Sequence, residues 1–136
     1  MSFNDDNVIY DRISSLEDII KKEEHQIELL TNSVARFKDR LEWLERMKIV
    51  YENFKPNTWE EWALKLYVES AELATVAKQL NEMGFRVPSA IKAKPERKIT
   101  TNDISDLLKV DPKSEIHECA ITFFEKKIKT YWGEKY

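Results

Sequence analysis

Residues 8–54 read VIYDRISSLEDIIKKEEHQIELLTNSVARFKDRLEWLERMKIVYENF, a stretch that contains no proline and no glycine. When Ile13 is placed at heptad position a, ten of the twelve a and d positions as far as Tyr51 carry apolar side chains, the exceptions being Glu23 and Lys48. A repeat that averages about 3.5 residues keeps an apolar stripe facing a partner helix while both helices supercoil. The stretch therefore predicts one long coiled-coil helix over residues 8–54, roughly 69 Å long at about 1.5 Å per residue.

The remaining chain is too short to cover this stripe along its whole length, so we expect a second copy to cover it. β-Branched residues at a and leucine at d favour two strands in a parallel coil. Glu23 at d either fixes the register or indicates an antiparallel pairing with a basic residue. A homodimer is expected, a higher oligomer stays open, and the alternative is a helix that folds back on the C-terminal helix of its own chain. The oligomerisation residues would be Ile13, Leu16, Ile20, Ile27, Leu30, Val34, Phe37, Leu41, Leu44 and Tyr51.

Composition favours an all-α fold, because only 2 glycines and 4 prolines interrupt a chain that is 35% charged. The single cysteine, Cys119, cannot form a disulfide within one chain, which indicates a reducing compartment. Residues 1–6 are acidic and lack the apolar core of a secretory signal. No apolar run approaches the roughly 18 residues of a membrane span. We expect a soluble, cytoplasmic protein without membrane contact.

A small helical domain is expected over residues 57–136, after a break at Lys55-Pro56-Asn57. Thr58 suits a helix N-cap. A helix should follow over residues 59–83 and stop at Gly84, with 70–72 as an alternative break that splits it in two.

A loop over residues 85–98 precedes a second helix start, where Thr100 and Asp103 have the spacing of a capping box. Asp111-Pro112 should end this short helix and open the last one, over residues 112–132. The loop is basic although the whole chain has a net charge of −3: residues 86–98 hold five Lys or Arg against one Glu. Local charge, rather than the total, decides contacts with phosphate.

Two stretches carry a resemblance to a known family. Residues 72–89 read ELATVAKQLNEMGFRVPS and residues 98–108 read KITTNDISDLL. Together they resemble the helix-turn-helix segment of the recombinase domain of large serine recombinases. In that family a helix ending in Leu-Asn-Glu-x-Gly is followed by a turn with proline, a basic stretch and a Thr/Ser-capped helix. The likeness covers about 40 of the 136 residues and carries no catalytic residue. It implies a DNA-reading module without recombination chemistry.

The residues of this segment suit DNA binding. A recognition helix needs a polar, exposed start near base edges, which Thr101, Asn102 and Ser105 would provide. Asp103 and Asp106 on the same helix would repel phosphate, and an ordinary helical hairpin with a solvated basic loop is the plainer interpretation. The candidate DNA-binding residues are Arg86, Ser89, Lys92, Lys94, Arg97, Lys98, Thr100, Thr101, Asn102, Ser105 and Lys109.

No residues form a pattern typical of catalysis or of a metal site. His117 and Cys119 lie two residues apart, whereas zinc takes three or four protein ligands, so we expect no metal and no cofactor and place Cys119 in the core. Two glycines cannot build a phosphate loop. Two hypotheses follow. The first is a non-enzymatic homodimer that binds double-stranded DNA, as a transcription regulator or an accessory factor of a phage, plasmid or other mobile element. The second is a protein-interaction adaptor or inhibitor that uses the coiled coil and an aromatic helical face to bind a protein partner.

Overall fold

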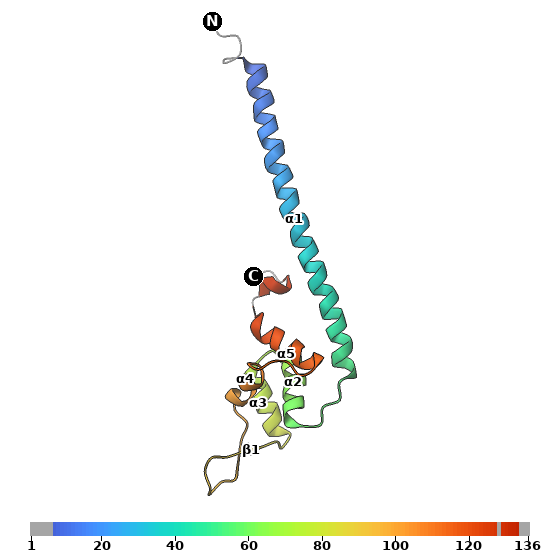
Figure 1. Cartoon of the computed structure of the whole chain (residues 1–136). Coiled ribbons are helices and arrows are strands. Elements are labelled where there is room, and N and C mark those ends of the chain that lie inside the picture. The colour runs from blue at the N-terminus through green and yellow to red at the C-terminus, as the bar shows by residue number, and fades with distance from the viewer. Residues whose placement is uncertain (1–6, 128, 134–136) are drawn as a thin grey trace. The chain divides into compact units, whose positions relative to one another are not determined.

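The computed structural model describes residues 7–127 and 129–133. Helices make up most of the chain (Figure 1), which confirms the predicted all-α fold with a long N-terminal helix. Two short strands pair antiparallel, with Val87 opposite Arg97 and Pro88 opposite Glu96. The elements are α1 (Val8–Asn53), α2 (Trp59–Ser70), α3 (Leu73–Glu82), β1 (Val87–Pro88), β2 (Glu96–Arg97), α4 (Thr101–Leu107), α5 (Glu115–Glu125) and the 3-10 turn η1 (Lys129–Trp132).

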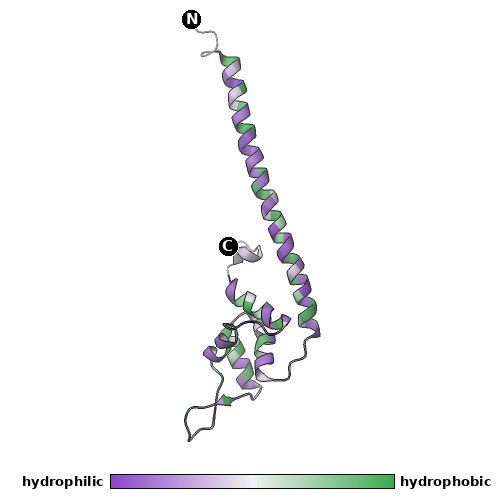
Figure 2. Cartoon of the chain, in the orientation of Figure 1, coloured by the Kyte–Doolittle hydropathy of each residue, from purple (hydrophilic) through white to green (hydrophobic). Residues whose placement is uncertain are grey.

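The chain divides into two compact units between Leu41 and Glu42. The first unit holds most of α1 and exposes the predicted stripe: its apolar a and d side chains from Ile13 to Leu41 are 41–67% exposed. Figure 2 shows green, hydrophobic segments that recur along the long helix between purple, hydrophilic ones. Within this unit the stripe has no covering element in the described residues, so its predicted partner stays a prediction.

The second unit begins inside α1, not at the linker. Met47 is only 2% exposed, and Val50, Tyr51 and Phe54 pack against the core of the unit. We predicted a boundary after Phe54, and the structure places it thirteen residues earlier, because the end of α1 packs on the small domain. Leu44 and Tyr51 of the predicted seam thus belong to this unit and are half-buried in it.

A tight break separates α2 from α3. Ala71 adopts a left-handed conformation with φ 54°, and its N–H donates to the Tyr67 carbonyl at 2.6 Å. Ser70 Oγ donates to the Leu66 carbonyl at 3.2 Å and accepts from the Glu72 N–H at 3.3 Å. The single helix predicted over residues 59–83 is therefore wrong, and its alternative, a break at 70–72, is confirmed.

Local signals place the next two helix ends where the sequence predicts them. Gly84 lies at φ 93°, the Phe85 N–H donates to the Leu80 carbonyl, and the Gly84 N–H donates to the Asn81 carbonyl. This is the Schellman arrangement that ends a helix at a glycine. At the start of α4, Thr100 and Asp103 form the predicted capping box.

The last helix is shorter than predicted. We expected residues 112–132, whereas α5 spans Glu115–Glu125 and a separate turn, η1, follows. Ser114 caps α5 by accepting the His117 N–H at 3.2 Å, so Pro112 lies before the helix and not at its first position. A serine hydroxyl can satisfy a free N–H at the helix start, which proline cannot do.

The second unit has one apolar core that α2, α3, α4 and α5 share. Its most deeply buried apolar side chains are those of Ala63, Tyr67, Val76, Leu80, Ile104, Ile116, Cys119 and Ala120. Among the residues that the structure describes, no helix has both the length and the apolar character needed to cross a membrane.

Candidate functional site

A basic hairpin projects from the helices of the second unit (Figure 1). Its strands are β1 and β2, and the Ser89 N–H donates to the Pro95 carbonyl at 2.9 Å where the loop between them closes. Lys92, Lys94 and Lys98 are all exposed. Among the described residues the structure records no carboxylate within salt-bridge distance of any of these three lysines. Their charges are therefore available to an anionic partner.

A salt bridge joins the base of this hairpin to the start of α4. Arg97 donates two hydrogen bonds to the Asp103 carboxylate, at 2.7 and 2.8 Å. The same carboxylate accepts the Thr100 N–H at 2.8 Å. The Arg97 guanidinium, helped by Thr100, lowers the pKa of Asp103 to about 2. Arg97 was predicted as a phosphate contact, but its charge is matched by Asp103, so its main effect is to position the hairpin against α4.

A second anchor, which the sequence did not reveal, holds the strand that leads into α4. Asn81, near the end of α3, donates from Nδ2 to the Ile99 carbonyl and accepts the Ile99 N–H on Oδ1, both at 2.9 Å. An amide side chain can satisfy both backbone groups of one residue in this way. The asparagine of the Leu-Asn-Glu-x-Gly pattern thus ties α3 to the segment beyond the hairpin.

Arg86 also acts within the fold. Its Nη1 donates to the Phe85 carbonyl at 2.6 Å and to the Asn81 carbonyl at 3.2 Å. Cations stabilise the carbonyl end of a helix. Arg86 therefore caps α3, although its side chain stays exposed.

The start of α4 presents part of the polar face that the sequence predicts. Thr100, Thr101 and Asn102 are exposed beside the hairpin. Ser105 is only 8% exposed, so the prediction that it lies on the exposed polar face is wrong. The seven-residue α4 turns Ser105 inward beside the buried Ile104, with the result that the polar face is limited to the first turn.

His117 and Cys119 lie in the core, and each has a structural role. His117 Nδ1 accepts the Lys113 N–H at 3.1 Å, and Nε2 lies 2.7 Å from the Leu107 carbonyl. Both ring nitrogens are therefore used by the backbone between α4 and α5. Burial raises the pKa of the Cys119 thiol to about 11, with a contribution from the nearby Glu118 carboxylate, which leaves the thiol unreactive near neutral pH.

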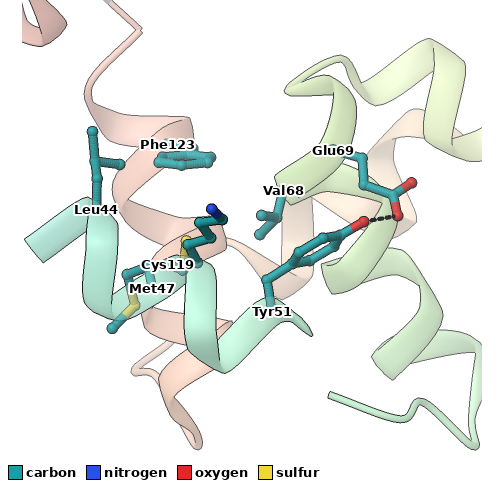
Figure 3. Close-up of a pocket in the computed structure, with 8 residues that line it drawn as sticks. Leu44, Met47, Tyr51, Val68, Glu69, Cys119 and Phe123 are labelled. Atoms are coloured by element: carbon teal, nitrogen blue, oxygen red, sulfur yellow. Dashed lines mark hydrogen bonds between the residues drawn. The ribbon is translucent and has the colours of Figure 1, made fainter. Parts of the chain in front are cut away.

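An apolar groove lies on another face of the second unit, between the end of α1, α2 and α5 (Figure 3). Its volume is about 430 Å³, and a hydrogen bond from the Tyr51 hydroxyl to Glu69 crosses one end at 2.5 Å. That bond is the main reason why the pKa of Tyr51 is raised. The lining residues are Leu44, Met47, Lys48, Tyr51, Val68, Glu69, Cys119 and Phe123.

The structure brings most of the predicted DNA-binding residues to the hairpin and the adjoining start of α4. Exceptions are Ser105, which is buried, and Lys109, which is exposed beyond the other end of α4. The groove contains the two last residues of the predicted oligomerisation seam, Leu44 and Tyr51. Comparison with known proteins found no family model, no curated protein and no solved structure that matches the chain.

Proposed function

We propose that the chain is a non-enzymatic DNA-binding protein that works as a homodimer. The observation that carries the proposal is the set of three exposed lysines, Lys92, Lys94 and Lys98, on a hairpin anchored to a polar helix start. In this proposal the lysines contact the phosphates of a duplex, and Thr101 and Asn102 approach base edges. Asparagine suits such a role because it can bond bidentately with adenine in the major groove.

The electrostatics support a modest and salt-sensitive affinity. Each lysine that neutralises a phosphate releases condensed counterions, which steepens the dependence of binding on salt. Three lysines supply a small contact set, and the exposed Asp106 on α4 opposes them. A single copy would therefore bind weakly.

In this proposal, self-association raises the affinity for DNA above that of a single copy. The exposed stripe from Ile13 to Leu41 offers an apolar seam, and an exposed row of apolar side chains is typical of a surface that contacts another protein. A second copy that covers the seam would double the DNA contacts and make the second contact intramolecular. By its resemblance to the recombinase segment, the protein would serve as a regulator or an accessory factor of a phage, plasmid or other mobile element.

Fluorescence anisotropy with a labelled duplex tests the proposal. The triple variant Lys92→Ala, Lys94→Ala, Lys98→Ala should bind more weakly than the unaltered chain. Its salt slope, d log K/d log[salt], should fall by about 3, at roughly 0.9 per lost phosphate contact. A matched control removes three lysines away from the hairpin: Lys21, Lys22 and Lys55. If the unaltered chain does not bind any duplex at about 50 mM salt, or if both variants lose affinity equally, the proposal fails.

The second candidate is a protein-interaction adaptor, and the open groove and the bare stripe favour it. Such a protein would not bind duplex DNA at any salt concentration. It would instead form a stable complex with a protein partner, which Leu44→Asp in the groove would weaken and the hairpin variant would not.

A further inference from the structure

The heptad pattern of the exposed stripe continues, in the sequence of α1, into residues that line the groove of the second unit. Because α1 is helical without interruption from Val8 to Asn53, one heptad register holds on both sides of Leu41. In that register Leu44, Lys48 and Tyr51 occupy positions d, a and d, and all three line the groove. Figure 3 shows Leu44 and Tyr51 on α1 facing Phe123 and Val68 across open space. The heptad pattern that begins at Ile13 therefore includes three residues that line the groove.

We propose that this groove receives the first turns of α1 from a second copy of the chain, in an antiparallel pair. The proposal rests on the self-association proposed above and adds its direction, its register and its docking site. In the proposed register, the numbers of opposed a and d residues sum to 57. Leu44 then faces Ile13 of the partner subunit, and Leu41 faces Leu16 of the partner subunit.

Apolar residues oppose one another in four of the five distinct layers between Ile13 and Leu44, and in the fifth layer Glu23 faces Val34 of the partner subunit. Phe37 meets Ile20 of the partner subunit, and Leu30 meets Ile27 of the partner subunit. A parallel coil in register would instead need Leu44, Lys48 and Tyr51 to pair with the same residues of a second helix. These side chains already face α2 and α5, and Tyr51 donates a hydrogen bond to Glu69. A parallel pair would bring this end of a second helix, together with its own domain, against the groove, whereas the antiparallel pair brings only the first turns of α1, with Ile13 of the partner subunit opposite Leu44 and Ile9 of the partner subunit opposite Lys48.

Charge favours the same direction. Residues 8–30 hold six acidic and three basic residues, whereas residues 31–53 hold four acidic and five basic residues. An antiparallel pair lays the acidic half of each helix along the basic half of the other. Glu17 then lies beside Lys38 of the partner subunit, twice by symmetry, whereas a parallel pair sets two Glu23 carboxylates against each other in the seam. Two like charges at such a short distance repel each other and destabilise an interface.

The charges of the side chains around the groove favour an acidic helix as its occupant. Lys48 lines the groove, and a second hollow of about 450 Å³, which shares Leu44 and Phe123 with it, is lined also by Lys126 and Lys127. Among the described residues, the one carboxylate that lines both hollows, that of Glu69, accepts the Tyr51 hydroxyl, so basic side chains outnumber acidic ones there. The first turns of α1 carry Asp11, Glu17 and Asp18 beside their apolar stripe. An acidic amphipathic helix therefore matches both the apolar floor and the basic rim.

Intermolecular paramagnetic broadening tests the docking site. A nitroxide is attached at Ser14→Cys, an exposed position outside the seam, in an otherwise unaltered chain. Cys119 is buried and its thiol pKa is about 11, so the label should attach at residue 14 alone; the chain without Ser14→Cys is the labelling control. Labelled chain is then mixed with chain that carries ¹³C-methyl methionine.

In the proposed register, residue 14 of the partner subunit lies opposite Trp43, so the nitroxide comes within roughly 20 Å of the Met47 methyl. We expect strong broadening of the Met47 signal and weaker broadening of Met83, the internal reference. In a parallel pair the same nitroxide lies roughly 50 Å from Met47, which would stay sharp.

Charge exchange gives an independent check. Glu17→Lys and Lys38→Glu should each raise the dimer dissociation constant roughly fivefold to tenfold, and the double variant should restore it. Two outcomes count against the proposal and are distinguishable. A dimer with a sharp Met47 signal and no restoration overturns the antiparallel docking and leaves self-association intact. A chain that sediments as a monomer at every concentration overturns both.

Discussion

Replacing Ala71 with glycine should stabilise the second unit, although most substitutions destabilise a protein. Ala71 has φ 54° and ψ 28°, and its side chain is exposed, so its methyl group contributes little packing. The left-handed conformation costs an L-residue about 1–2 kcal/mol and costs glycine almost nothing. The greater freedom of glycine in the unfolded chain offsets about 0.5–1 kcal/mol of this gain. The net gain in the free energy of unfolding should be about 0.5–1 kcal/mol.

For a domain of this size such a gain raises the melting temperature by about 3–6 °C. Tryptophan fluorescence is a suitable probe, because all four tryptophans lie within residues 42–136 and report on that unit alone. Protein concentration must be held constant, since self-association would shift the apparent stability. The matched control is Ala74→Gly, at an exposed position in the first turn of α3. It should lower the free energy of unfolding, by less than the roughly 1 kcal/mol that glycine costs in a helix interior. If Ala71→Gly destabilises the unit as Ala74→Gly does, the left-handed break at residue 71 is refuted.

Three further predictions concern the anchors of the second unit. The pKa of Asp103 is lowered to about 2, so its bond with Arg97 stabilises the fold above about pH 4, and this stabilisation is lost as the pH falls through about 2. Asp103→Asn should lower the free energy of unfolding at pH 7 and make it depend less on pH in the acidic range. Unfolding followed by fluorescence from pH 2 to 7 measures both effects. His117 should carry a ring proton on Nε2 and none on Nδ1, because Nδ1 accepts the Lys113 N–H, and the ¹⁵N shifts of its ring would contradict this if they showed Nδ1–H. Its replacement by alanine should cost about 2–4 kcal/mol of unfolding free energy. The Cys119 thiol should react with a disulfide reagent only at the rate of unfolding, so fast labelling of the native chain would place it at the surface.

Features of the fold that depend on neighbouring residues were predictable from the sequence. Thr58, Gly84 and the Thr100/Asp103 pair mark helix ends through bonds that span only a few residues, and the structure has each of them. The break at Ala71 could be named only as an alternative, because alanine is the strongest helix former and nothing in its side chain requires a left-handed backbone. The turn is stabilised instead by backbone and Ser70 bonds at the end of α2.

Features that depend on distant residues were not predictable. Asn81 and Ile99 are eighteen positions apart, and no periodicity connects them. A sum of charges over residues 86–98 counts Arg97 as an unpaired cation, whereas in the structure Arg97 forms a salt bridge with Asp103. The heptad pattern identified the apolar face of α1 correctly, yet a pattern cannot say what covers a face. Along Ile13–Leu41 nothing in the described unit covers it, whereas Leu44 and Tyr51 face their own domain.

The two proposals constrain each other through the direction of the coil. An antiparallel pair places the two hairpins at opposite ends of the coiled coil, so each hairpin would contact its own stretch of DNA. Avidity then arises only when the spacing of two sites matches the separation of the hairpins, and it vanishes when the geometry forbids simultaneous contact. A short duplex would bind with the affinity of a single hairpin, which rests on three lysines. Affinity should therefore rise sharply above a threshold duplex length in the unaltered chain. In a variant that does not dimerise, such as Leu30→Asp with Val34→Asp, the affinity should rise only in proportion to the number of sites. A parallel pair, with its hairpins at the same end, would reach full avidity on a much shorter duplex, so the length dependence reports the direction of the coil independently of the groove.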